Sequence, residues 1–121
     1  MSEPPFTETE LRFLVSPPNA LARIATIGSD GTLHVVPSGW TYNEALGTID
    51  VTGREVNKTK KFRDVTRTGK AAIVVDGIAA GEGFRPWAIE VAGPAEAIGA
   101  PEALIRIHPE RVRSWGLEFV V

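Results

Sequence analysis

Short runs of apolar and β-branched residues, separated by tight-turn signals, follow one another along most of this chain. Residues 20–28 form one such run with an alternating pattern, and residues 33–41 form the next. Asp30-Gly31 lies between them, and an Asp-Gly pair in this position is a strong signal for an antiparallel hairpin. The sequence therefore predicts a mainly β protein whose first two strands pair through this turn.

Two short helices are predicted beside the strands. Thr7 and Glu10 have the spacing of a capping box, which marks the start of a helix over residues 8–15. Asn57 is the expected N-cap of a second helix over residues 58–67. No run of the chain approaches the roughly 18 apolar residues of a membrane span, so no membrane partner is expected.

The remaining strands leave one ambiguity, which lies in the tail of the chain. Leu104, Ile107 and His108 have helical spacing, but the residue before Pro109 is disfavoured in a helix, so two short strands are preferred. Strands linked by hairpins and one helical crossover predict an antiparallel barrel rather than a sandwich or a doubly wound sheet. The strands predicted after the first hairpin are residues 48–52, 71–76, 87–98, 104–108 and 111–115.

Composition excludes several classes of site. The chain has no cysteine, which rules out disulfides, thiolate metal sites and cysteine nucleophiles. His34 and His108 are the only histidines, and no metal-binding spacing involves them, so both are expected to be structural or strand-surface residues. At least two of Trp40, Trp87 and Trp115 are expected to pack in the core or an interface, which leaves one for stacking on an aromatic ligand. No phosphate-binding glycine motif or nucleophile elbow is present.

Positive charge is concentrated in one short segment. Residues 54–70 contain seven basic and two acidic residues, whereas the rest of the chain contains six basic and thirteen acidic residues. A local positive field of this kind attracts anions. A basic helix face that is merely solvated is equally compatible with these residues. Nucleic-acid binding is not expected, because the bases are confined to one segment of a chain with a net charge of −2.

The start of the second predicted helix favours an anion. Lys58, Lys60 and Lys61 lie in or near its first turn, where each cation opposes the helix dipole at a cost of about 0.3–1 kcal/mol. A phosphate or carboxylate at this position removes that cost and accepts the free backbone N–H groups. Arg54, at the end of the preceding strand, is within reach of the same place. Arg67 and Lys70, further along, are expected to be surface residues.

Several stretches resemble one known family, the pyridoxamine 5'-phosphate oxidase-like split β-barrels that bind FMN. The opening run at residues 21–37, with its Asp-Gly turn and its Val-Pro ending, is similar to the first hairpin of that family. Residues 50–65 resemble its next strand and basic helix start. The tail at residues 105–117 resembles an actinobacterial subgroup that depends on coenzyme F420, a deazaflavin.

This resemblance implies a six-stranded antiparallel split β-barrel with short flanking helices, formed by residues 1–121 as a single domain. It implies a homodimer that holds its cofactor in a groove at the dimer interface, and the sequence itself places the protein in the cytoplasm. The implied activity is hydride transfer from coenzyme F420 to a small organic acceptor, with FMN as the alternative cofactor and a non-catalytic cofactor-binding protein as a further alternative. The first five residues, which show no signal-peptide pattern, agree with the cytoplasm.

The resemblance also assigns residues to the cofactor position by position. It implies no catalytic side chain, since the cofactor carries the redox chemistry. The residues implied to bind the cofactor phosphate are Arg54, Lys58, Thr59 and Lys61, and those implied to line the ring and ribityl path are Val36, Pro37, Ser38 and Thr52.

Two places depart from the family pattern. Relatives more often have tryptophan in place of Phe84 and arginine in place of Trp87, and they often have arginine in place of Ala92. These departures bear on the substrate pocket. The glycine-rich insert at residues 79–83 is a candidate lid over it.

Overall fold

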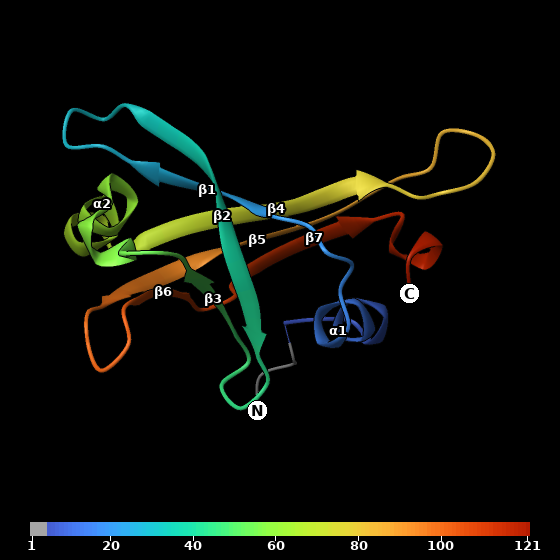
Figure 1. Ribbon diagram of the computed structural model, residues 1–121, viewed down its shortest axis with the longest axis horizontal. Helices are drawn as coiled ribbons and strands as arrows, with labels where there is room; N and C mark the ends of the chain where they lie inside the picture. Colours follow the sequence, from blue (N-terminus) through green and yellow to red (C-terminus); the bar gives the residue numbers. More distant parts are fainter. Residues whose placement is uncertain (1–4) are drawn as a thin grey trace.

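Six antiparallel strands close into a barrel, and a seventh strand runs along its side (Figure 1). The ring runs β4-β1-β2-β3-β6-β5 and closes through the pairing of β4 with β5, while β7 pairs with β5 outside the ring. This computed structural model describes residues 5–121, so most of the N-terminal segment used to judge a signal peptide lies outside the described residues. The strands are β1 (Ala22–Ile27), β2 (Leu33–Asn43), β3 (Thr48–Thr52), β4 (Lys70–Ile78), β5 (Pro86–Ile98), β6 (Leu104–Ile107) and β7 (Arg111–Trp115).

The predicted six-stranded antiparallel barrel is confirmed. The Asp30-Gly31 turn joins β1 to β2 as expected, and Ala22 to Ile27 pair in register with Ser38 to Leu33. The ambiguous tail forms the two short strands β6 and β7, as preferred. Each of the two is held by β5, so tertiary pairing with that strand stabilises segments too short to be stable alone.

A bend at Gly93-Pro94 lets β5 serve both halves of the barrel. Its first part pairs with β4 and β7, and its last part, from Ala95 onward, pairs with β6. A Cβ on Gly93 would lie 2.0 Å from the backbone oxygen of His108, so no larger residue fits at this crossing. Pro94 lacks an N–H, which suits the point where β5 changes partner.

The barrel interior is filled by aliphatic side chains, and the two helices cover its open sides. α1 (Glu8–Val15) begins at the predicted capping box and places the buried Phe13 ring 5.3 Å from the ring of Trp87. Neither described helix is long and apolar enough to cross a bilayer, since α1 has 8 residues and α2 has 9. The side chains that are essentially inaccessible at the centre are Ile24, Ile49, Val51, Ile73, Val75, Ile89, Ile105 and Ile107.

The predicted start of the second helix is wrong by two residues. α2 spans Lys60–Thr68, and its N-cap is Thr59 rather than Asn57. The reason is tertiary: Val56 is 1% exposed, and its burial draws residues Val56–Lys58 into a separate turn of 3₁₀ helix, η1. The Thr59 hydroxyl accepts a hydrogen bond from the Phe62 N–H and donates one to the Val56 carbonyl, which fixes the junction.

Candidate functional site

A tight connection between β3 and α2 gathers four of the predicted cofactor residues. Arg54, Lys58 and Thr59 lie within this connection, and Lys61 is the second residue of α2. Glu55 at its centre has φ +51°, a left-handed conformation that costs a non-glycine residue about 1–2 kcal/mol. Such strained residues concentrate at functional sites, where the surrounding structure holds them in place. The left-handed backbone at Glu55 therefore makes this turn a candidate functional segment.

Lys58 already has a partner, but a weak one. Its Nζ lies 3.0 Å from Oε1 of Glu55, and these side chains are 70% and 61% exposed. Exposed ion pairs contribute about 0–1 kcal/mol, so a phosphate can displace Glu55 at little cost. The Lys58 carbonyl also accepts a hydrogen bond of 3.2 Å from the guanidinium of Arg63. Arg63 thus stabilises the backbone conformation of the turn through this hydrogen bond.

Lys61 is a half-buried cation, and the structure gives it no carboxylate partner among residues 5–121. Burial lowers the pKa of its ammonium group below the ordinary value, because the charged form is poorly hydrated there. Arg54 is exposed and likewise forms no ion pair within the described chain. An anion bound between the two would neutralise both charges.

Thr59 has a different place in this turn. Its hydroxyl is used twice within the chain, as acceptor for the Phe62 N–H at 3.3 Å and as donor to the Val56 carbonyl at 2.6 Å. The side chain therefore shapes the helix start. Both hydrogen bonds of the hydroxyl are thus made within the chain, so Thr59 positions the backbone of the turn.

The other four predicted residues lie on the neighbouring strands β2 and β3. Gly39 pairs with Thr52, and the Ser38 hydroxyl donates a hydrogen bond of 3.1 Å to the Thr52 carbonyl, so these two residues meet. Strand alternation puts Val36 and Ser38 on one face of β2 and Pro37 on the other, but only Ser38 is buried and Val36 is 40% exposed. The side chains of this group thus do not converge on one point, although their backbones form one continuous path to Arg54.

A buried carboxylate in α2 was missed by the sequence reasoning. Asp64 is 2% exposed, and it accepts hydrogen bonds of 2.8 Å from the Thr26 hydroxyl and from Nδ1 of His34. Burial raises the pKa of Asp64, but the hydrogen bonds from His34 and Thr26 lower it by more, and the net pKa is below the ordinary value. Its position next to the apolar Val65, as the one acid of a basic helix, is the sequence signal that identifies it.

Arg67 belongs to the same cluster, which corrects its expected role as a plain surface residue. Its guanidinium lies 3.5 Å from Oδ1 of Asp64 and also donates to the carbonyl of Ile27. The basic face of α2 therefore divides into two parts. At one end, Lys61 forms no ion pair with a carboxylate among residues 5–121. At the other end, Arg67 and Asp64 fasten the helix to β1 and β2.

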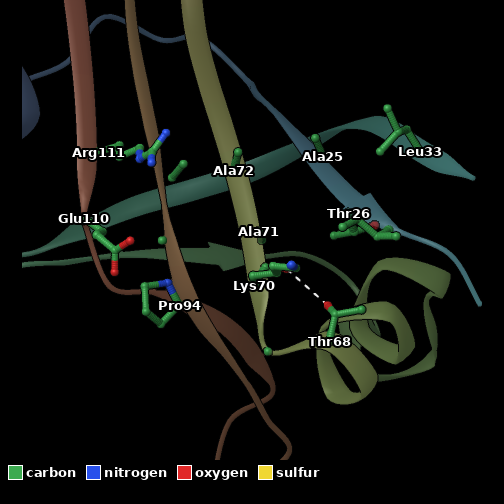
Figure 2. Close-up of a pocket in the computed structure, with 14 residues that line it drawn as sticks. Ala25, Thr26, Leu33, Thr68, Lys70, Ala71, Ala72, Pro94, Glu110 and Arg111 are labelled. Carbon is green, nitrogen blue, oxygen red and sulfur yellow. Dashed lines mark hydrogen bonds between the residues drawn. The ribbon is translucent and has the colours of Figure 1, made fainter. Parts of the chain in front are cut away.

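A groove of about 670 Å³ lies outside the barrel, past the C-terminal end of α2. Figure 2 shows small side chains in its lining, including Ala25 and Ala72, with Lys70 near Thr68 and Arg111 near Glu110. None of the eight predicted cofactor residues lines this groove. The structure thus separates it from the turn that holds Arg54 and Lys61.

The sequence of the chain has a clear relative of known activity. It is 33% identical, over 123 residues, to the 5a,11a-dehydrotetracycline/5a,11a-dehydrooxytetracycline reductase of Streptomyces rimosus. The match covers 94% of this chain and 85% of the relative. The chain belongs to the family of this reductase. No protein-family model matches the chain, so membership of this dehydrotetracycline reductase family rests on the direct comparison.

Solved structures share the fold of this chain at much lower sequence identity. A conserved hypothetical protein of Mycobacterium tuberculosis has a TM-score of 0.72 at 17% identity, covering 95% of this chain and 88% of its own. An FAD-binding protein of Mesorhizobium loti has a TM-score of 0.67 at 20% identity, covering 90% and 92%. A protein named F420 reductase has a TM-score of 0.65 at 16% identity, covering 89% and 98%. The barrel is therefore a fold that is found among flavin-type and deazaflavin-type proteins.

Proposed function

We propose that this chain is a reductase that uses coenzyme F420 and binds the cofactor phosphate at the turn between β3 and α2. The observation that carries the proposal is Lys61, a half-buried cation without a carboxylate partner in the described chain, beside Arg54 and Lys58. The dehydrotetracycline reductase relative supports the reductase activity. The F420 reductase that shares the fold supports a deazaflavin.

The residues of the turn fit such a group by their chemistry. Arg54, Lys58 and Lys61 supply positive charge, and the first turn of α2 adds the positive end of a helix dipole. Pro37 and Thr52 continue the path along β2 and β3 toward the ring, together with the backbone of Val36 and Ser38. The bound deazaflavin supplies the hydride, while the protein orients it and excludes water.

FMN is the second candidate cofactor, because the same donors suit its phosphate and an FAD-binding protein shares the fold. We also propose that two copies of the chain associate. Leu33 and Val35 are 77% and 65% exposed on the outer face of β2, beside Pro37. Clustered apolar side chains of this kind usually mark a contact surface.

Removing the cations of the turn is expected to weaken cofactor binding. Arg54→Ala, Lys58→Ala and Lys61→Ala should each raise the dissociation constant about tenfold or more, because each removes a charged hydrogen-bond donor to the phosphate. Affinity should also fall as salt is raised. The measurement is a fluorescence titration of each purified protein with coenzyme F420 and, separately, with FMN.

Lys70→Ala is the matched control, since it removes an exposed lysine beyond the other end of α2 and should bind like the wild type. If all three site variants bind both cofactors as tightly as the wild type, the phosphate does not bind at this turn. A wild-type protein that binds neither cofactor would reject the proposed function as a whole.

A further inference from the structure

Three large apolar side chains stand exposed around one hollow. The hollow lies beside the β4–β5 hairpin, and Figure 1 shows this hairpin projecting from the barrel. Ile78, Phe84 and Trp115 are 65%, 78% and 50% exposed, and all three line this space of about 580 Å³. Trp115 is brought there by its pairing with Ala88 on β5. Exposed apolar side chains gathered around a concave surface indicate a binding site.

The hollow also carries polar groups. Trp87 lies at its base with its ring 5% exposed, and the structure records no acceptor for the indole N–H within residues 5–121. A Cβ on Gly77 would lie 2.6 Å from Cζ2 and 3.2 Å from Nε1 of this ring, so the glycine is what allows the indole edge to lie there. Arg23 and Asp76 form an ion pair on the wall, with side chains 54% and 49% exposed.

This combination fits a planar molecule with polar oxygens better than it fits a protein surface. Aromatic and aliphatic walls suit flat rings, and the indole N–H is a hydrogen-bond donor for a carbonyl or hydroxyl oxygen. Arg23 and Asp76 are able to bond further oxygens on the rim. A protein contact would bury this charged pair, and charged residues are depleted from the cores of protein interfaces.

The hollow is also next to the proposed cofactor path. Arg23 is the ladder partner of Pro37, and both face the outside of the barrel. Neighbouring strands are about 4.8 Å apart, so a molecule that contacts Arg23 lies one strand away from the ring position assigned to Pro37. The candidate lid at residues 79–83 forms the tip of the hairpin above it.

We propose that the hollow between Trp115 and the β4–β5 hairpin binds the acceptor substrate, a planar fused-ring molecule that bears carbonyl or hydroxyl oxygens. This assignment rests on the proposed reductase function, because it locates the acceptor of that reaction. It makes Trp115 and Phe84 the walls of the site and Trp87 the donor at its base.

The test is equilibrium dialysis of the full chain against tetracycline, a fused four-ring molecule, with 4-hydroxybenzoate as a single-ring comparison. The wild type should bind tetracycline and should bind the single ring much more weakly. Trp115→Ala and Phe84→Ala should each weaken tetracycline binding about tenfold, since each removes one aromatic wall. Both side chains are exposed, so neither change should disturb folding.

Leu46→Ala is the control, because Leu46 is also an exposed apolar residue, 57% accessible, but does not line the hollow. Cofactor titrations of the same proteins separate the two proposals: Trp115→Ala should bind coenzyme F420 or FMN like the wild type. If the cofactor binds but tetracycline does not, or if the aromatic variants bind tetracycline unchanged, the acceptor site is wrong and the cofactor assignment stands. Sedimentation that shows a dimer broken by Trp115→Ala, with tetracycline binding unchanged, would make the hollow a contact between copies and overturn the proposal.

Discussion

Arg106→Met is expected to lower the free energy of unfolding by about 3 kcal/mol, toward the lower end of the cost of breaking a buried ion pair. Asp50 on β3 is 6% exposed. Nε of Arg106 on β6 donates to its Oδ1, and Nη2 of Arg106 donates to its Oδ2, both at 3.1 Å. The substitution keeps the aliphatic packing but leaves this carboxylate without its cation. The lower end applies because the Arg106 side chain retains 21% of its surface.

The carboxylate of Asp50 accepts hydrogen bonds from two further side chains, which will reduce the loss of stability in Arg106→Met. Asn43 Nδ2 and Thr48 Oγ1 lie 3.1 Å and 3.0 Å from its oxygens. Burial raises the pKa of Asp50, but the hydrogen bonds from Arg106, Asn43 and Thr48 lower it by more, so its net pKa lies below the ordinary value. Arg106→Met should therefore raise the pKa of Asp50, because it removes the first of these hydrogen bonds.

Urea unfolding followed by circular dichroism measures this effect. Arg111→Met is the matched control, because Arg111 on β7 is exposed and should change the stability by less than about 0.5 kcal/mol. A variant Arg106→Met that unfolds at the wild-type urea concentration would show that the Asp50 cluster contributes nothing to stability. In that case the joining of β2, β3 and β6 would rest on backbone pairing and apolar packing alone.

The elements that the sequence predicted correctly are those with local signals. The capping box of Thr7 and Glu10 gives α1 its observed bounds, and the Asp30-Gly31 turn gives the β1–β2 hairpin. Residues 48–52 form β3 as predicted, since alternation and flanking turns are both local features. The barrel itself followed from counting such segments and their short connections.

What the sequence did not reveal depends on residues far apart in the chain. The shift of the α2 N-cap from Asn57 to Thr59 results from the burial of Val56 against the barrel. The hydrogen bond between His34 and Asp64 joins residues 30 positions apart, and no local pattern requires it. The hollow at Trp115 exists because β7 pairs with β5 at Ala88, which periodicity alone does not predict. The charge pattern predicted an anion site at the turn between β3 and α2, which stays a prediction, and it did not reveal that Arg67 pairs with Asp64.

Asp64→Ala is expected to lower the free energy of unfolding by about 3 kcal/mol, because it leaves buried donors without an acceptor. Thr26 is 3% exposed and the Asp64 side chain is its acceptor, while His34 and Arg67 approach the same carboxylate from β2 and from α2. The substitution removes the link that fastens α2 across the end of the barrel. Thermal unfolding measures the loss, and Glu110→Ala, which removes an exposed carboxylate, is the control.

Asp64→Asn separates the charge of this residue from its shape and predicts a particular pH dependence. The folded pKa of Asp64 lies below its ordinary value of 3.8, so ionisation contributes stability above that value, and the contribution is lost as pH falls through the folded pKa. Wild-type stability should therefore decline on acidification below about pH 4, and the decline in Asp64→Asn should be less steep because the amide does not titrate. Parallel declines in the two proteins would show that the carboxylate charge does not stabilise the cluster. If Asp64→Ala is less stable than the wild type and Asp64→Asn is as stable as the wild type, hydrogen bonding rather than charge stabilises the cluster. Hydrogen bonding would then also be what docks α2, the helix whose first turn is proposed to hold the cofactor.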